Sequence, residues 1–261
     1  MRNIETIGLR FLTFLSSLKP FRALCRAIVS FIYFADFIKL REIRIVRKFL
    51  KPERGERVVD IACGWGVYNI YIAKKGCQVF ELDRSQRALK LANVISKGYD
   101  CSQQIGDATA LPYRSNVFDK CTCICALEHF IDDQKALTEM NRVLKLGGIL
   151  ILTVDSFTYR GISDDIKERH ARVCHVVNYY TYPLLEDKLR KAGFSVEEKM
   201  FLFNSPISSF FYSLAIKLQF GYCVKLLFPI AYGLTILDRF WKRNNEGYHL
   251  VIKARKASAV A

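Results

Sequence analysis

The stretch Asp60–Gly66 reads DIACGWG, and it decides the fold. It follows the apolar run RVVD and precedes VYNIYIAKK, in which apolar residues recur at helical spacing. Glycines directly after a buried strand let the backbone approach a ligand closely, and the next helix presents its N-terminus to that ligand. The stretch therefore predicts a strand–loop–helix unit that binds a nucleotide-type ligand.

Short apolar runs alternate with amphipathic segments along the chain, and this alternation predicts a mostly parallel, doubly wound α/β sheet. The stretch between 156 and 181 is polar and predicts no element. The expected strands lie at 57–62, 77–83, 101–107, 117–126, 149–155, 195–201 and 248–256, and the expected core helices at 66–76, 85–98, 132–148 and 182–194.

Two apolar segments flank the predicted core, and the sequence shows no internal repeat. We expect an N-terminal helical extension at 1–54, the core at 55–200, an apolar helical insertion at 201–243, and the last strand with a tail at 244–261. The segment from 201 to 241 contains 11 aromatic residues. We therefore expect one domain with an apolar N-terminal extension and an apolar insertion before the last strand.

The net charge of +15 belongs to the two ends of the chain. Residues 1–57 hold 13 Lys or Arg against 5 Asp or Glu, and residues 199–261 hold 9 against 2, whereas the middle is balanced. Basic residues mixed with apolar and aromatic ones favour an anionic membrane surface. A helical layer that covers the core with a solvated basic edge explains the same pattern, and so does a homodimer interface.

Neither end contains the roughly 20 consecutive apolar residues that a membrane-spanning helix needs. The first residues also lack the apolar region and cleavage site of a signal peptide. We therefore expect a cytoplasmic protein that docks on the membrane peripherally. A nucleic-acid partner is not expected, because the basic ends are greasy rather than polar and no NPPY-type motif occurs.

The nine cysteines form no CxxC pair. Cys121, Cys123 and Cys125 alternate, which places them on one face of a strand. Small buried thiols in a reducing compartment explain this pattern, so no metal site is expected.

Two acids follow the next strands of the predicted sheet, where ligands bind in doubly wound folds. Asp83 ends the second strand, and a carboxylate there accepts hydrogen bonds from ribose hydroxyls; Glu81 competes for this role, and a helix N-terminal acid before Ser85 is the plain alternative. Asp107 ends the third strand and accepts from an exocyclic amine. A dinucleotide fingerprint would place a third glycine at Asn69, and its absence weakens an NAD site.

At this point the chain resembles the class I S-adenosylmethionine-dependent methyltransferases, in the branch of the ubiquinone and menaquinone methyltransferases and many small-molecule enzymes. The matching stretches cover roughly residues 55–200 and are specific for fold and cofactor, but not for substrate. They are VVDIACGWG, ELDRS, GDATALPYRSNVFD, ALEHF, ALTEMNRVLKLGGILILTV and LRKAGFSVEE. The resemblance implies a Rossmann-like sheet of seven strands whose last strand is antiparallel.

The resemblance also implies a role for residues at the strand ends. The methionine side of the cofactor would contact Asp60, Ala62, Cys63, Gly64 and Gly66, and Ala126 would lie near the sulfonium. The adenosine side would contact Asp83, flanked by Leu82 and Arg84, and then Asp107 and Ala108. Trp65 is bulkier than the residue usual at its position, and its role is left open.

Methyl transfer to a hydroxyl needs a general base as well as alignment. His129, next to Glu128 in ALEHF, is the first candidate, and His175 is the second; a structural histidine that caps the loop is the alternative for His129. In this branch, N-terminal helices and late insertions cover the acceptor. The aromatic insertion therefore predicts a small, hydrophobic or lipid-linked acceptor, and a non-catalytic cofactor-binding module acting as a sensor or partner subunit is the alternative function.

Overall fold

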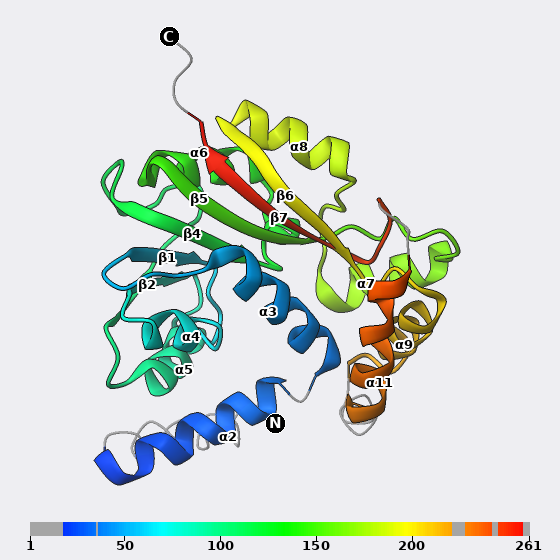
Figure 1. Ribbon diagram of the computed structural model, residues 1–261, viewed down its shortest axis with the longest axis horizontal. Helices are drawn as coiled ribbons and strands as arrows, with labels where there is room; N and C mark the ends of the chain where they lie inside the picture. Colours follow the sequence, from blue (N-terminus) through cyan, green and yellow to red (C-terminus); the bar gives the residue numbers. More distant parts are fainter. Residues whose placement is uncertain (1–17, 35, 221–227, 242–244, 258–261) are drawn as a thin grey trace.

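The computed structural model of the chain describes residues 18–34, 36–220, 228–241 and 245–257. Its centre is a seven-stranded sheet with the order β3-β2-β1-β4-β5-β7-β6 (Figure 1). The strands are β1 (Arg57–Ile61), β2 (Gln78–Asp83), β3 (Cys101–Ile105), β4 (Phe118–Ile124), β5 (Leu144–Asp155), β6 (Phe194–Leu202) and β7 (His249–Lys256). β7 runs antiparallel to β5 and β6, and the remaining pairs are parallel, which confirms the predicted fold class.

The strand order reverses at β1, which pairs with β2 on one side and β4 on the other. Asp60 lies opposite Glu81 in one ladder and opposite Thr122 in the other. The carboxyl ends of three parallel strands therefore meet at this reversal, which is where ligands bind in such sheets.

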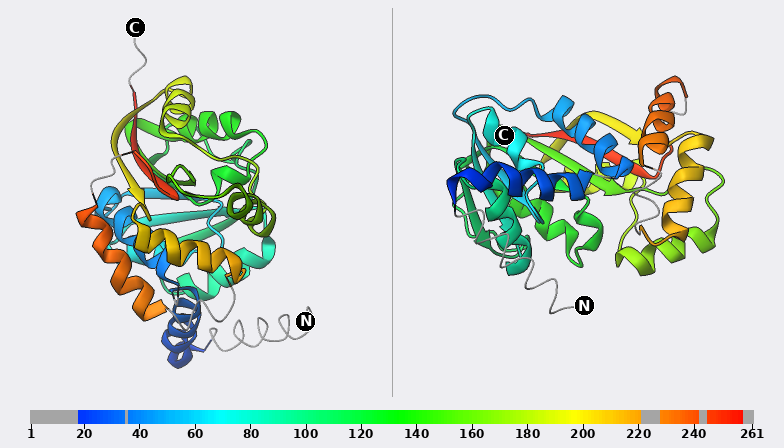
Figure 2. Two further views of the ribbon diagram at one scale, coloured as in Figure 1. Left: turned by 90° about the vertical axis from the view of Figure 1, so that its right-hand side faces the viewer. Right: turned by 90° about the horizontal axis from the view of Figure 1, so that it is seen from below.

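Helices cover both faces of the sheet, so its strands are apolar on both sides (Figures 1 and 2). On one face, α6 (Asp133–Val143) and α8 (Tyr182–Lys191) bury Leu137 and Leu189 in a core that includes Val59. On the other face, α3 (Phe37–Leu50) and α4 (Asn69–Lys74) contribute to a second core. α5 (Gln86–Ser96) packs on β2 and β3, and the side chain of Ser85 caps it as predicted.

A helical cover, formed by α2 (Arg22–Phe34), α3, α9 (Pro206–Lys217) and α11 (Phe228–Thr235), lies on the same side of the sheet as α4 and α5 (Figure 1). α11 contacts α3 and α9, so the two ends of the sequence meet in this layer. α2 packs on α5, where Val29 and Ile95 share a small apolar cluster. Arg26 fixes this contact by donating from Nε to the Ile95 carbonyl at 2.8 Å.

Two predictions of local structure between 132 and 181 were wrong. The helix expected at 132–148 ends at Val143, and the next residues belong to β5. They pair with β4 across a register shift between Phe118 and Lys120, and Gly147 adopts φ +74°, so sheet pairing overrides the helical pattern. The polar stretch contains α7 (Asp164–Cys174), capped by the Ser163 side chain.

Short 3₁₀ turns complete the fold: η1 (Lys19–Phe21), η2 (Leu127–His129) and η3 (Ile236–Phe240). Parts of the predicted extension and insertion, namely 1–17, 221–227 and 242–244, lie outside the described residues. Among the residues that are described, no helix is both long and apolar enough to cross a bilayer. Cys121 and Cys123 are buried in the sheet as expected, whereas Cys125 follows the end of β4.

Candidate functional site

The DIACGWG loop leaves β1 in a left-handed backbone conformation at three positions. The φ angles of Ala62, Gly64 and Gly66 are +56°, +55° and +63°. A Cβ on Gly66 would lie 2.3 Å from Glu81 Oε1, so only glycine fits there. Gly64 N–H donates to Asp83 Oδ2 at 2.9 Å, and the loop is thereby fastened to the end of β2.

Two cavities open beside this loop, and Ala62 lines both. The larger cavity, of about 330 Å³, is lined by Ala62, Leu82, Asp83, Arg84, Gly106, Asp107, Ala108, Thr109, His129, Phe130, Ile131 and Asp132. The smaller cavity, of about 250 Å³, is lined by Lys39, Asp60, Ala62, Cys63, Gly64, Trp65, Tyr68, Ile124 and Cys125. Their lining residues come from the carboxyl ends of β1, β2 and β4 and from the loops that follow these strands.

Asp83 and Asp107 both face the larger cavity. Asp83 accepts a second backbone hydrogen bond, from Ser85 N–H to Oδ1 at 2.7 Å, so its carboxylate is held in a fixed orientation. Asp107 accepts from the backbone and hydroxyl of Thr109 at 2.8 and 2.7 Å, and these bonds hold the pKa of Asp107 below its usual value. Arg84 Nε lies 3.7 Å from Asp107 Oδ2 at the rim.

Asp60 is buried at the floor of the smaller cavity. Its carboxylate accepts from Thr122 Oγ1 at 2.6 Å and from Asn69 Nδ2 at 2.9 Å. Burial raises the pKa of Asp60 to about 7, although these hydrogen bonds oppose the shift. The carboxyl is therefore half protonated near neutral pH, and a cation in the cavity would favour its ionised form.

Asn69, which stands where a dinucleotide fingerprint has glycine, links two buried acids. Its Nδ2 donates to Asp60 Oδ2 and to Glu81 Oε1, both at 2.9 Å. Glu81 is fully buried and also accepts from Gln103 Nε2 at 2.6 Å, and burial raises its pKa. The carboxylate of Glu81 is thus occupied by hydrogen bonds inside the protein, whereas Asp83 lines the larger cavity.

The three candidate catalytic residues, His129, His175 and Glu128, differ in their position relative to the cavities. His129 is exposed and lines the larger cavity, and its Nδ1 lies 3.2 Å from the carbonyl oxygen of His175. His175 ends α7 with φ +56° and lines neither cavity. Glu128 is buried, and burial together with the charge of Asp155 raises its pKa well above the usual value.

Two backbone positions predicted from the resemblance, Gly66 and Ala126, also line neither cavity. Gly66 supports the loop from behind through its contact with Glu81. Ala126 is buried one residue beyond Cys125, which does reach the smaller cavity.

The smaller cavity is also lined by Lys39 and Tyr68, which the sequence did not predict as site residues. Lys39 comes from α3, and Tyr68 donates from its hydroxyl to Glu42 Oε2 at 2.8 Å. The open question of Trp65 has a structural answer: it lines the smaller cavity and packs against the apolar cluster of Val29 and Ile95 beneath α2. No local motif predicts these contacts, because they depend on how α2 and α3 pack against the loop and α4.

Comparison with known proteins agrees with this geometry. Residues 59–152 match the family described as "Methyltransferase domain". A demethylmenaquinone methyltransferase of Renibacterium salmoninarum is 40% identical over 98 residues, which cover 38% of this chain and 40% of that protein. The chain therefore spans well under half of the length of that relative.

Solved structures resemble the chain over most of its length. Phosphoethanolamine N-methyltransferase 2 of Haemonchus contortus, in complex with S-adenosyl-L-methionine, gives a TM-score of 0.63 at 18% identity and covers 84% of this chain and 52% of that one. The [4+2]-cyclase SpnF gives 0.61 at 22% identity and covers 84% and 81%. Since one neighbour is titled a cyclase, the shared fold does not define the reaction.

The sheet order, the glycine loop and the matched segment together identify the core of the chain as a class I S-adenosylmethionine-dependent methyltransferase domain. Asp60, Asp83 and Asp107 lie at or just after the carboxyl ends of β1, β2 and β3, the edge at which doubly wound sheets bind ligands.

Proposed function

We propose that the protein transfers a methyl group from S-adenosylmethionine to a small hydrophobic or lipid-linked acceptor. The observation that carries the proposal is the pair of cavities that share Ala62, with Asp83 and Asp107 lining one and Asp60 lining the other. The larger cavity suits the adenosine, and the smaller one suits the methionine. A methyl group between them would face the cavity wall formed by Ile124 and Cys125.

Each acid has a suitable partner on the cofactor. Asp83 would accept from the ribose hydroxyls, and Asp107 from the adenine amine, with Ala108 and Leu82 against the ring. Asp60 would face the ammonium group, whose charge favours the carboxylate form. Cys63, Gly64 and Arg84 complete the walls. When bound, the cofactor supplies the electrophilic methyl carbon, and the chain aligns the acceptor and excludes water.

His129 is our proposal for the general base where the acceptor is a hydroxyl. A carbonyl oxygen only accepts hydrogen bonds, so Nδ1 of His129 carries the proton toward the His175 carbonyl. Nε2 is then left with a lone pair. Glu128 supports the same turn, because its carbonyl accepts from the backbone of Val177 and Asn178 at 2.9 and 3.0 Å.

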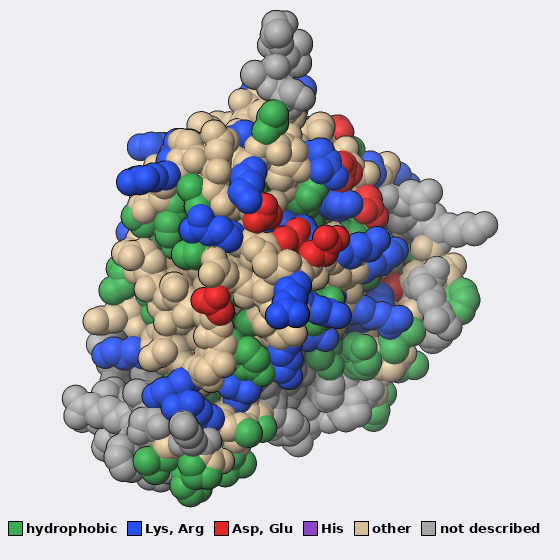
Figure 3. Space-filling view, turned by 60° about the vertical axis from the view of Figure 1, so that its left-hand side comes forward, with side chains coloured by type: hydrophobic (Ala, Val, Ile, Leu, Met, Phe, Trp, Pro, Cys, Tyr) green, Lys and Arg blue, Asp and Glu red, His purple; other side chains and the backbone are tan. Residues whose placement is uncertain are grey.

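The acceptor class follows from the helical cover. Large apolar side chains are exposed on it, including Leu24, Phe210 and Ile230. Figure 3 shows hydrophobic side chains along the lower edge of one face, beneath a band of Lys and Arg side chains. This pairing favours docking on the anionic cytoplasmic leaflet and uptake of an acceptor from the bilayer. The relative that acts on demethylmenaquinone supports an acceptor of this class.

The direct test is methyl transfer from labelled S-adenosylmethionine into a membrane lipid extract. We expect label in an organic-soluble product, with strongly reduced label when Asp83→Asn replaces the wild type at a cofactor concentration below the dissociation constant of the variant. Cofactor binding by calorimetry without transfer to any extract fraction would instead support a non-catalytic binding module. A homodimer that hides the apolar cover would appear as a doubled mass in sedimentation without lipid.

A further inference from the structure

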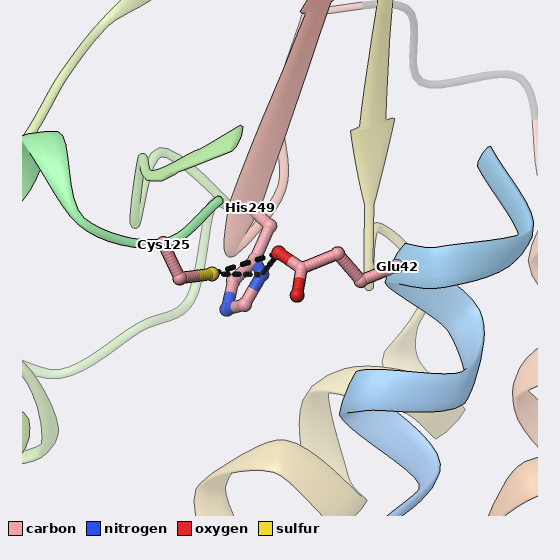
Figure 4. A group of neighbouring side chains, drawn as sticks. All are labelled: Glu42, Cys125 and His249. Carbon is pink, nitrogen blue, oxygen red and sulfur yellow. Dashed lines mark hydrogen bonds and ion pairs between the residues drawn. The ribbon is translucent and has the colours of Figure 1, made fainter. Parts of the chain in front are cut away.

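Three side chains with metal-binding atoms converge behind the smaller cavity (Figure 4). Glu42 projects from α3, Cys125 follows β4, and His249 begins β7. Glu42 Oε1 lies 2.7 Å from Cys125 Sγ and 3.5 Å from His249 Nδ1, and Cys125 Sγ lies 3.8 Å from the same nitrogen. Three segments distant in sequence thus bring a carboxylate, a thiol and an imidazole to one point.

The far side of His249 is already oriented by other groups. Its Nε2 lies 2.6 Å from the Tyr212 hydroxyl and 3.3 Å from Asp155 Oδ1. With the proton on Nε2, shared with these oxygens, the Nδ1 lone pair would be able to bind a metal on the side of Glu42 and Cys125. A histidine held by a carboxylate on one nitrogen, with its other nitrogen free to ligate, is the usual outer arrangement of zinc sites.

Buried carboxyl groups gather around this cluster. Glu42, Asp155 and Glu128 are all buried, and their carboxyl groups lie close enough to influence one another's ionisation. In the described part of the chain, the Lys or Arg side chain paired with this group is Lys39, 3.5 Å from Glu42 Oε2. Glu128 Oε2 is buried with no hydrogen-bond partner among the described residues. Buried carboxylates of this kind are normally paired or bound to metal.

Cys125 adopts a strained backbone to reach the cluster. Its φ angle is +47°, in the left-handed region that non-glycine residues rarely occupy. Its backbone N–H donates to the Thr153 hydroxyl at 2.8 Å, and Thr153 donates in turn to Glu42 Oε1 at 2.7 Å. Cys125 also lines the smaller cavity. Such strain concentrates at functional sites.

We propose that Glu42, Cys125 and His249 bind a zinc ion beside the smaller cavity. Thiolate, imidazole and carboxylate are the ligands that Zn²⁺ prefers, and tetrahedral bonds of about 2.0–2.3 Å would separate the ligand atoms by roughly 3.5 Å. The two distances to His249 Nδ1 match this value. The closer Cys125–Glu42 pair would open by rotation of the carboxylate when the metal displaces the thiol proton, which is released to solvent. This site revises the expectation of no metal from the sequence.

Three protein ligands leave a fourth position on the ion, as in catalytic zinc sites. Because Cys125 borders the smaller cavity, that position faces the space next to the methionine end. Resting on the proposed function, we assign the fourth position to the oxygen or sulfur atom of the methyl acceptor. Coordination would lower the pKa of that atom and prepare it as the nucleophile.

The test is metal binding by the full chain, purified with its affinity tag removed. We expect about one zinc per chain by elemental analysis. Titration of metal-depleted protein with Co²⁺ should give the visible bands of a tetrahedral site and a sulfur-to-metal charge-transfer band. Absence of both the zinc and the charge-transfer band in the wild type overturns the proposal.

Matched variants locate the site. Cys125→Ser should lose the charge-transfer band, whereas Cys101→Ser, a half-buried thiol on the edge strand β3, should retain it. Asp155→Asn should weaken Co²⁺ binding about 10- to 100-fold while keeping the band, because it acts through His249. Retention of the band in Cys125→Ser overturns the assignment, and if that variant fails to fold, the wild-type band and the Asp155→Asn shift decide.

Metal binding and methyl transfer fail separately. Stoichiometric zinc without methyl transfer supports the site and contradicts the proposed function. If protein that takes up neither zinc nor Co²⁺ transfers methyl groups at an unchanged rate, the proposed function is supported and the zinc site is contradicted.

Discussion

Under the proposed function, the site has a donor half, which would hold the cofactor, and an acceptor half, which is the wall of the smaller cavity formed by Lys39 and Cys125. The two halves are built from different kinds of sequence. The donor half lies on consecutive strand ends between Asp60 and Thr109, where each residue is placed by its own strand and loop. The acceptor half joins Lys39 on α3 to Cys125 after β4, with His249 of β7 behind them. Local pattern therefore determines the first half, and long-range packing of the helical cover determines the second.

The largest effect is expected at the glycines of the loop that follows β1, in the donor half. Gly66→Ala should lower the free energy of unfolding by about 2–5 kcal/mol, because left-handed strain of about 1–2 kcal/mol adds to an overlap cost of about 1–3. The added Cβ would meet Glu81 Oε1 at 2.3 Å. Denaturant unfolding of the cofactor-free protein measures this loss.

Gly64→Ala is the matched control, because its φ is also positive but nothing lies within 4 Å of its Cβ. We expect a loss of only about 1–2 kcal/mol, from strain alone. Equal losses in the two variants would show that the packing of the loop on Glu81 does not matter.

A second prediction concerns the fixed carboxylate of the donor half. Asp83→Asn should weaken binding of S-adenosylmethionine by about 2–3 kcal/mol, or roughly 30- to 150-fold, because charge-assisted hydrogen bonds to the ribose are lost. One backbone bond, from Gly64 or Ser85, is lost as well. Calorimetry gives the affinity, and Glu53→Gln, far from the cavities on an exposed turn, is the control that should bind normally. Wild-type affinity in Asp83→Asn would exclude Asp83 as the ribose ligand.

A third prediction follows from the raised pKa of Asp60, which burial brings to about 7. If the cofactor ammonium binds the ionised carboxylate, affinity should rise about tenfold between pH 6 and pH 8, and binding should release protons below pH 7. For the free protein the sign is opposite. The uncharged carboxyl favours folding at low pH, and this contribution is lost as pH rises through 7.

Titration calorimetry in buffers of different ionisation enthalpy measures the released protons. Asp60→Asn should abolish both the proton release and the affinity change. A pH profile unaltered by that substitution would assign the titration to another group.

The difference between the two halves also explains which parts of the fold and the site could be predicted from the sequence. Alternation of apolar runs predicted the sheet and its strands. Asp83 and Asp107 line the same cavity because parallel strand ends meet at one edge, and their contacts with the cofactor remain a prediction. Sequence reasoning missed Asn69 as the link between buried acids, because its role depends on Glu81 in the neighbouring strand.

The acceptor half lacked any comparable signal. Tyr68 and Glu42 are separated by 26 residues and His249 by many more, yet they share one buried network. One local signal does exist outside the acceptor half, because Ser163 followed by two acids is a capping pattern that predicts the start of α7. Contacts between distant helices have no period or spacing that a single sequence reveals.

The smallest effect is expected on the surface of the helical cover. Leu24 on α2 is 54% exposed, and Leu146 at the amino end of β5 is 65% exposed. Replacement of either by Gln should change the free energy of unfolding by no more than about 0.5 kcal/mol, as is usual for exposed positions. If the cover docks on lipid, Leu24→Gln alone should weaken flotation with anionic liposomes, by about 1 kcal/mol or several-fold, because one apolar side chain no longer enters the bilayer. Equal flotation of both variants and the wild type would assign the exposed apolar residues to a second copy of the chain or to closure of the site, and the acceptor half would then have to be loaded from solution.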